Sequence, residues 1–103
     1  MFTGSENHDI PISEAAEMTA RYRATMNESS RKGGFFGVKK LREILDQPDC
    51  VGIRYYYGLD ENNQQVLVLT GVKANEDDIV DGVIAEAAIP CPNQCGNNNL
   101  LNS

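Results

Sequence analysis

The stretch CVGIRYYYGLDENNQQVLVLTGV, residues 50–72, carries the clearest structural pattern in the chain. Within residues 50–59, large apolar or aromatic side chains alternate with other residues at a period of two, which predicts a half-buried strand. The polar run at residues 60–65 predicts a hairpin turn, and residues 66–72 predict a returning strand that is apolar on both faces and central in its sheet. One face of the first strand carries Val51, Ile53, Tyr55, Tyr57 and Leu59, and the other carries Gly52, Arg54, Tyr56 and Gly58.

Two helices are expected before this hairpin. The first runs from Ser13, placed to cap it, to about Asn27. The second follows a flexible connection at residues 29–34, and Pro48 ends it because a residue before proline is pushed out of the α region. The stripe expected to contact the core is Ala15, Met18, Tyr22 and Met26 on the first helix, and the second has Phe35, Val38, Leu41, Ile44 and Leu45 at helical spacing.

Residues 78–89 fit both a helix face and a strand, and we favour a third strand because a hairpin alone is marginal. Residues 1–12 are expected to form a loose arm and residues 90–103 an irregular tail. The prediction is therefore a single α+β domain over residues 1–103, with two N-terminal helices packed on a short antiparallel sheet of two or three strands.

Composition and charge restrict the classes of partner. The chain has 103 residues, is 41% hydrophobic and 23% charged, and carries a formal net charge of -6. Nucleic acid and anionic membranes attract basic proteins, so neither is expected as a partner. Because the first residues show no leader pattern and no window is apolar enough to span a membrane, we expect a soluble cytoplasmic protein.

Cys91 and Cys95, in the segment IPCPNQCGNNN (89–99), form the most reactive pair of side chains in the sequence. The favoured interpretation is reduced thiols that hold the tail against the sheet, since a cytoplasmic compartment keeps thiols reduced. A ring-closing Cys91–Cys95 disulfide is the first alternative. A redox dithiol has the wrong spacing, and a zinc site would have to recruit Cys50 and His8, so no metal or other cofactor is expected.

Two further segments are candidate binding sites. The segment RKGGFFGVKK (31–40) places glycines and bases before an expected helix N-terminus, which favours anions but matches no phosphate-loop pattern. The alternative is an inter-helix loop with Phe35 or Phe36 in the core. On the hairpin, Arg54 and Tyr56 suit an interaction face, because both residue types are enriched at binding hot spots, although a helix could instead cover Tyr56. The candidate anion-binding residues are Arg31, Lys32, Gly33, Gly34 and Lys39.

The helical segment around Ala15–Arg23, the stretch VGIRYYYGLDENNQQVLVLTGV and the segment PCPNQCG together resemble a family of small uncharacterised bacterial proteins. The resemblance covers about residues 13–101 and implies one compact bacterial domain, with no reaction and no site residues. The function expected from the sequence is a non-enzymatic protein-interaction module that binds an unknown protein partner or forms a homo-oligomer. The alternative is a small anionic-ligand-binding protein or a cysteine-dependent metal or redox protein.

Overall fold

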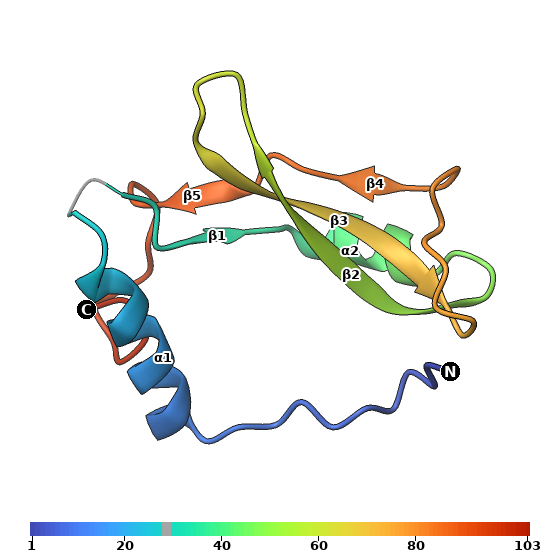
Figure 1. Ribbon diagram of the computed structural model, residues 1–103, viewed down its shortest axis with the longest axis horizontal. Helices are drawn as coiled ribbons and strands as arrows, with labels where there is room; N and C mark the ends of the chain where they lie inside the picture. The colour runs from blue at the N-terminus through green and yellow to red at the C-terminus, as the bar shows by residue number, and fades with distance from the viewer. Residues whose placement is uncertain (28–29) are drawn as a thin grey trace. The chain divides into compact units, whose positions relative to one another are not determined.

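A computed structural model describes residues 1–27 and 30–103 and divides the chain into two compact units (Figure 1). The hairpin unit comprises Met1–Glu6 and Phe36–Ala88, and the cysteine unit comprises Asn7–Phe35 and Ile89–Ser103. Each unit holds a helix and an antiparallel sheet, so the chain is of the α+β class. In the described part of the chain, no helix has the length and apolar character that crossing a membrane requires.

The hairpin unit is built on an antiparallel sheet with the strand order β2-β3-β4. Strand β2 spans Cys50–Leu59 and β3 spans Gln65–Lys73, as predicted, with β3 in the centre. The register places Ile53 opposite Gly71 and Tyr55 opposite Leu69. The third strand expected from residues 78–89 is much shorter: β4 covers only Ile84–Ala85.

The core of the hairpin unit lies between this sheet and helix α2, Val38–Leu45. Ile44 has no exposed surface and packs with Leu69 and Ala85. Burying one such side chain contributes about 1.5–3 kcal/mol to the free energy of folding. As the fully buried side chain of α2, Ile44 is the main apolar contact between helix and sheet. Partly buried side chains around this cluster are Phe36, Leu41, Ile53 and Val83.

Gln47, just after α2, connects the end of the helix to the segment before β4. Its Nε2 donates to the Ile44 carbonyl at 2.9 Å, and its Oε1 accepts from the Val83 N–H at 2.7 Å. A Cβ on Gly82 would lie 2.0 Å from Gln47 Oε1, and one on Gly71 would lie 2.9 Å from Nε2. The two glycines therefore provide the space that the Gln47 amide occupies.

The cysteine unit contains helix α1 (Ile12–Ala24) and a two-stranded sheet of β1 (Gly33–Phe35) and β5 (Ile89–Cys91). Gly33 pairs with Cys91, and Phe35 pairs with Ile89. The Lys32 N–H extends this pairing by donating to the Cys91 carbonyl at 2.6 Å. Residues 33–35 therefore pair with a segment that lies on the far side of the whole hairpin in the sequence.

Several predictions about the helices were wrong. The N-cap of α1 is Pro11, whose carbonyl accepts from Glu14 and Ala15, rather than Ser13. No residue of α1 is buried, and Met18 on the expected core stripe is 53% exposed, since the sheet described in the cysteine unit consists of only two three-residue strands. The second helix begins at Val38, since Phe35 belongs to β1.

The packing of both helices on one sheet is not confirmed. Helix α2 packs on β2 and β3, whereas α1 belongs to the other unit. The first residues, expected as part of a loose arm, belong to the hairpin unit, where the Phe2 N–H donates to the Ala74 carbonyl at 2.9 Å. Of the expected irregular tail, Pro90 and Cys91 lie in β5. The expected flexible connection at 29–34 begins at a residue outside the described part of the chain, and Gly33–Phe35 is a strand.

Candidate functional site

Arg54 and Tyr56, the residues of the predicted interaction face, are brought together by Asp78. The Arg54 Nη1 donates to Asp78 Oδ1 at 2.5 Å and to the Glu76 carbonyl at 3.1 Å. The Tyr56 hydroxyl donates to Asp78 Oδ2, and the Phe2 ring centre lies 5.8 Å from the Arg54 guanidinium carbon. We call Arg54, Tyr56 and Asp78 the Asp78 cluster. Its hydrogen bonds hold two side chains of β2 in fixed positions.

The electrostatics of the Asp78 cluster favour a permanent ion pair. The hydrogen bond from Tyr56, and then the bond and charge of Arg54, hold the pKa of Asp78 below its ordinary value. The bond to Asp78 raises the pKa of Tyr56, and the bond and charge of Asp78 raise the pKa of Arg54. A general acid or base working near neutral pH needs a pKa near neutrality. The pKa of Asp78 and the pKa of Tyr56 are both shifted away from neutrality.

Asp78 was not singled out from the sequence. Asp78 reaches Arg54 because a turn at Lys73–Asp77, in which the Lys73 N–H bonds to the Asp77 carbonyl at 2.9 Å, folds the chain back so that Asp78 bridges Val72. The sequence feature that could have indicated this contact is Arg54, the one arginine of the strand at residues 50–59, together with the acidic residues that follow the second strand of the hairpin. Tyr56 is 47% exposed, and the helix of its own unit, α2, packs toward the other face of β2, the one that carries Ile53.

The opposite face of β2 carries a second group of side chains, Tyr55, Tyr57 and Leu59, which we call the tyrosine surface. They lie on the same face as the core residue Ile53, because side chains two apart in a strand share a face. Figure 1 shows α2 behind one part of the hairpin, whose turn extends past the helix. Tyr55, Tyr57 and Leu59 are 56%, 69% and 69% exposed. The two tyrosine rings meet edge to face, with centroids 5.6 Å apart.

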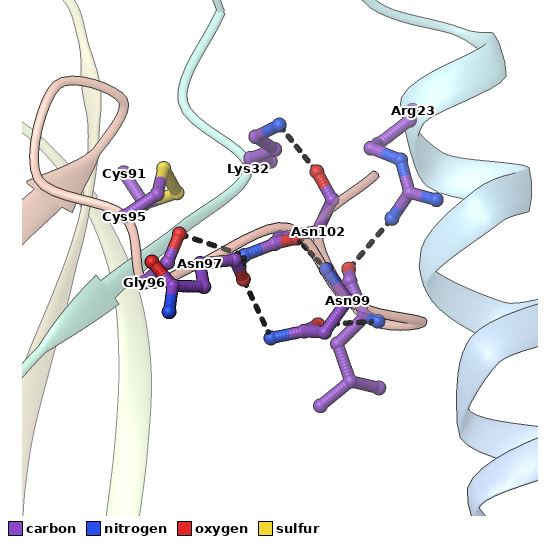
Figure 2. Close-up of a disulfide and its surroundings, with 9 residues drawn as sticks. Arg23, Lys32, Cys91, Cys95, Gly96, Asn97, Asn99 and Asn102 are labelled. Carbon is purple, nitrogen blue, oxygen red and sulfur yellow. Dashed lines mark hydrogen bonds between the residues drawn. A yellow bond between two sulfur atoms is a disulfide. The ribbon is translucent and has the colours of Figure 1, made fainter.

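Cys91 and Cys95 form a disulfide (Figure 2), whereas reduced thiols were the favoured expectation. Their Cα atoms are 4.8 Å apart, within the range that a disulfide spans. The turn that allows this is closed by the Gln94 N–H, which donates to the Pro90 carbonyl at 3.1 Å. Proline and glycine around the pair favour such a turn over a helix. The two sulfurs are therefore bonded to each other in this structure.

After the disulfide, an asparagine-rich loop folds on its own side chains (Figure 2). The Asn102 side chain donates to the Asn97 carbonyl at 3.2 Å and accepts from the Asn99 N–H at 2.8 Å. Arg23 of α1 donates to the Leu101 carbonyl at 2.6 Å, and Lys32 donates to the Asn102 carbonyl at 2.5 Å. Two basic side chains thus attach the loop to α1 and to the start of β1.

These basic side chains border a groove of about 530 Å³ within the cysteine unit. Its lining includes Tyr22, Arg23, Met26, Arg31, Lys32 and Asn102. Two of the predicted anion-binding residues, Arg31 and Lys32, therefore meet a third base, Arg23, that the sequence did not indicate. The described lining side chains include the bases Arg23, Arg31 and Lys32 and no acidic side chain. The groove could hold an anion.

The other predicted anion-binding residues lie elsewhere. Gly33 and Gly34 are in β1, paired with Cys91 and Pro90, and do not form the N-terminus of α2, whose N-cap is Gly37. Lys39 is in α2 and belongs to the hairpin unit. The predicted site depended on a helix starting at Phe35. That start is wrong because the backbone of Gly33–Phe35 is extended and paired with β5.

The remaining candidate ligands for a metal belong to different units. Cys50 is a free thiol in the hairpin unit, with its Sγ 3.2 Å from the Gly52 carbonyl oxygen, and His8 is an exposed residue of the cysteine unit. Among residues 1–27 and 30–103, no three histidine, cysteine, aspartate or glutamate side chains form a group that could hold a metal ion.

Comparisons with known proteins found no match to this chain. No protein-family model, curated protein or solved structure matches it, and the resemblance to uncharacterised bacterial proteins stays a prediction.

Proposed function

We propose that the chain is a non-enzymatic protein-interaction module that binds a protein partner through β2. The observation that carries this proposal is the position of β2 at the edge of its sheet, with the tyrosine surface on one face and the Asp78 cluster on the other. A strand at an edge presents unpaired backbone groups and can add a further strand. Its side chains then contribute contacts on both faces.

The composition of β2 suits this role. Tyrosine buries a large rigid surface at a small cost in conformational entropy and is enriched in protein interfaces. The single charge of the strand, Arg54, is already paired with Asp78, so covering it would not leave an isolated charge. Tyr57 and Leu59 are each 69% exposed and would lose most of this exposure on binding.

A photo-cross-linker placed on β2 tests the proposal. Leu59→benzoylphenylalanine is expected to give adducts with defined residues of another protein chain, and Tyr57→Ala in the same chain is expected to reduce their yield. The matched control is Leu45→benzoylphenylalanine, since Leu45 is also in the hairpin unit and 47% exposed, but on α2. Adducts that are absent, or equal at both positions, would contradict binding through β2.

A second candidate function, binding of a small anion, is favoured by the groove beside Arg23. Arg23 and Lys32 bond there to backbone carbonyls, which do not cancel their charge. Guanidinium and ammonium groups together suit a phosphate or carboxylate, and Tyr22 and Met26 add apolar contact.

Thermal melting with added phosphate or citrate tests this second candidate. A ligand at about 100 times its dissociation constant stabilises the folded state by about 2.7 kcal/mol. Arg23→Gln is expected to lose this stabilisation, whereas Arg21→Gln, on the same helix and paired with Glu17, is expected to keep it. If neither anion raises the melting temperature of the wild type, the groove does not bind this class of ligand.

A further inference from the structure

The backbone of β2 has a definite inner and outer side. The Asp60 N–H donates to the Gln64 carbonyl at 3.0 Å, which makes Asp60 and Gln64 a hydrogen-bonded pair in the register of the hairpin. Because hydrogen-bonded and non-hydrogen-bonded pairs alternate, the even-numbered residues 54, 56 and 58 bond to β3. The odd-numbered residues direct their N–H and C=O groups away from β3. These residues are Ile53, Tyr55, Tyr57 and Leu59.

A contact on the far side of β3 supports this assignment. Ile53 is opposite Gly71, and the Gly71 carbonyl accepts from the Ile79 N–H at 2.8 Å on the side away from β2. Gly71 therefore does not bond to Ile53, as the alternation requires. In the described part of the chain β2 pairs with β3 and with no other strand.

The outer edge from Ile53 to Leu59 lacks the usual protection of edge strands. Natural edges are blocked by proline, by unpaired charge, by a bulge or by a covering segment. Here the bulge lies between Cys50 and Gly52, and the N-terminal segment covers the same end, where a Cβ on Gly4 would be 3.0 Å from the Val51 carbonyl oxygen. Beyond that point, within the hairpin unit, no other strand pairs with this edge, and the strand carries the tyrosine surface.

We propose that the partner of β2 is a second copy of this chain, joined by antiparallel pairing of the two β2 edges about a twofold axis at Tyr56. This inference rests on the proposed function and names the partner. In this register Ile53 pairs with Leu59 of the second copy, and Tyr55 pairs with Tyr57 of the second copy. Every outward backbone group from Ile53 to Leu59 is then used. A shift by one residue would set inward groups against outward ones, and a shift by two would leave outward groups unpaired.

The side chains are self-complementary in the same register. On the face of the tyrosine surface, aromatic rings meet across the interface, and Ile53 meets Leu59 of the second copy. On the other face, Arg54 lies opposite Gly58 of the second copy, which has no side chain to clash with it. No like charges face each other. The two sheets of order β2-β3-β4 become one continuous sheet with β2 strands at its centre.

Sedimentation of the purified chain over about 1–100 µM tests the pairing. The wild type is expected to form dimers. Tyr57→Pro removes an outward N–H without removing a bond to β3, whereas Tyr57→Ala removes the same ring and keeps that N–H. We expect Tyr57→Pro to raise the dimer dissociation constant more than about tenfold above that of Tyr57→Ala, with both variants folded by circular dichroism. Equal dissociation constants would overturn pairing through the backbone edge.

Cross-linking tests the register itself. In a Cys50→Ser background, Tyr56→Cys places two thiols opposite each other in a non-hydrogen-bonded pair, with Cα atoms about 4.5 Å apart, and is expected to oxidise to a covalent dimer. The control is Val68→Cys, opposite Tyr56 on β3, whose thiols would be about 14 Å apart across three strand spacings. A chain that stays monomeric and does not cross-link overturns the inference. If the chain is monomeric but Leu59→benzoylphenylalanine gives adducts with a different protein, the proposed function stands and only the inference of a second copy is overturned. If no adducts form at all, both the proposed function and the inference are overturned.

Discussion

The Gln47 amide offers the sharpest test of how the hairpin unit is held together. Gln47→Ala removes the bond to the Val83 N–H at 2.7 Å and the bond to the Ile44 carbonyl at 2.9 Å. Each bond contributes about 0.5–1.5 kcal/mol net, and the partly buried Val83 N–H is left without a partner. We therefore expect a loss of about 2 kcal/mol in the free energy of unfolding, which lowers the melting temperature by about 10 °C.

Gly82→Ala attacks the same contact from the other side. The added Cβ would lie 2.0 Å from Gln47 Oε1, so the amide has to move and release Val83. Alanine also restricts the conformations of the unfolded chain, which offsets this loss by about 0.4–1 kcal/mol in the free energy of unfolding. The net expectation is a loss of about 1–2 kcal/mol.

The double variant, Gln47→Ala with Gly82→Ala, tests whether the two losses in the free energy of unfolding arise from the same contact. With Gln47→Ala already made, the closest contact of the new Cβ is gone, and Ile79 Cγ2 at 2.9 Å still has to shift. Gly82→Ala should then cost less than it does in the wild type, which gives a coupling energy of about 1 kcal/mol. Urea denaturation of the four proteins measures it, with Gln64→Ala in the exposed hairpin turn as a control within about 0.5 kcal/mol of wild type. Additive losses would refute the shared contact.

Three further outcomes are expected. Ile44→Ala should lose about 2–5 kcal/mol in urea denaturation because Ile44 is fully buried, whereas Leu45→Ala, at an exposed site on the same helix, should lose less than about 1 kcal/mol; equal losses would contradict the core. Alkylation of the denatured but unreduced chain should modify one cysteine, and alkylation after reduction should modify all three, because Cys91 and Cys95 are joined; three modified without reduction would exclude the disulfide. The pKa of Asp78 is lowered on folding, so its contribution to stability is present above its ordinary pKa of 3.8 and is lost as the pH falls through the lower folded value; Asp78→Asn should reduce the difference in stability between about pH 6 and about pH 2, and an unchanged difference would contradict the cluster.

The hairpin was predictable because its signals are local. A period of two over residues 50–59, a polar turn and a second apolar run lie side by side in the sequence, and the structure forms β2 and β3 within one residue of the expected limits. The end of α2 was equally local, since Pro48 follows it. For the same reason the spacing of Met18 and Tyr22 correctly predicted a helix, although it could not show whether an apolar layer would cover them.

The features that were missed depend on residues far apart in the chain. Phe35 fits a helical spacing with Val38, but it pairs with Ile89, which no local pattern could reveal. Asp78 gains its role only when a turn brings it beside Arg54. The Cys91–Cys95 bond was considered and ranked below free thiols, because the ranking used the expected compartment instead of the turn geometry.

The pairing of β1 with β5 has a consequence for the order of folding. The residues that open the hairpin, Leu59 and Gln65, are six positions apart, whereas Phe35 and Ile89 enclose nearly the whole hairpin unit. Closing a chain loop roughly nine times longer costs about 2 kcal/mol more in entropy. We expect residues 36–88 to collapse first and to shorten the effective distance between the two strands. The cysteine unit would then form late, after the folding of residues 36–88 has brought β1 and β5 close together.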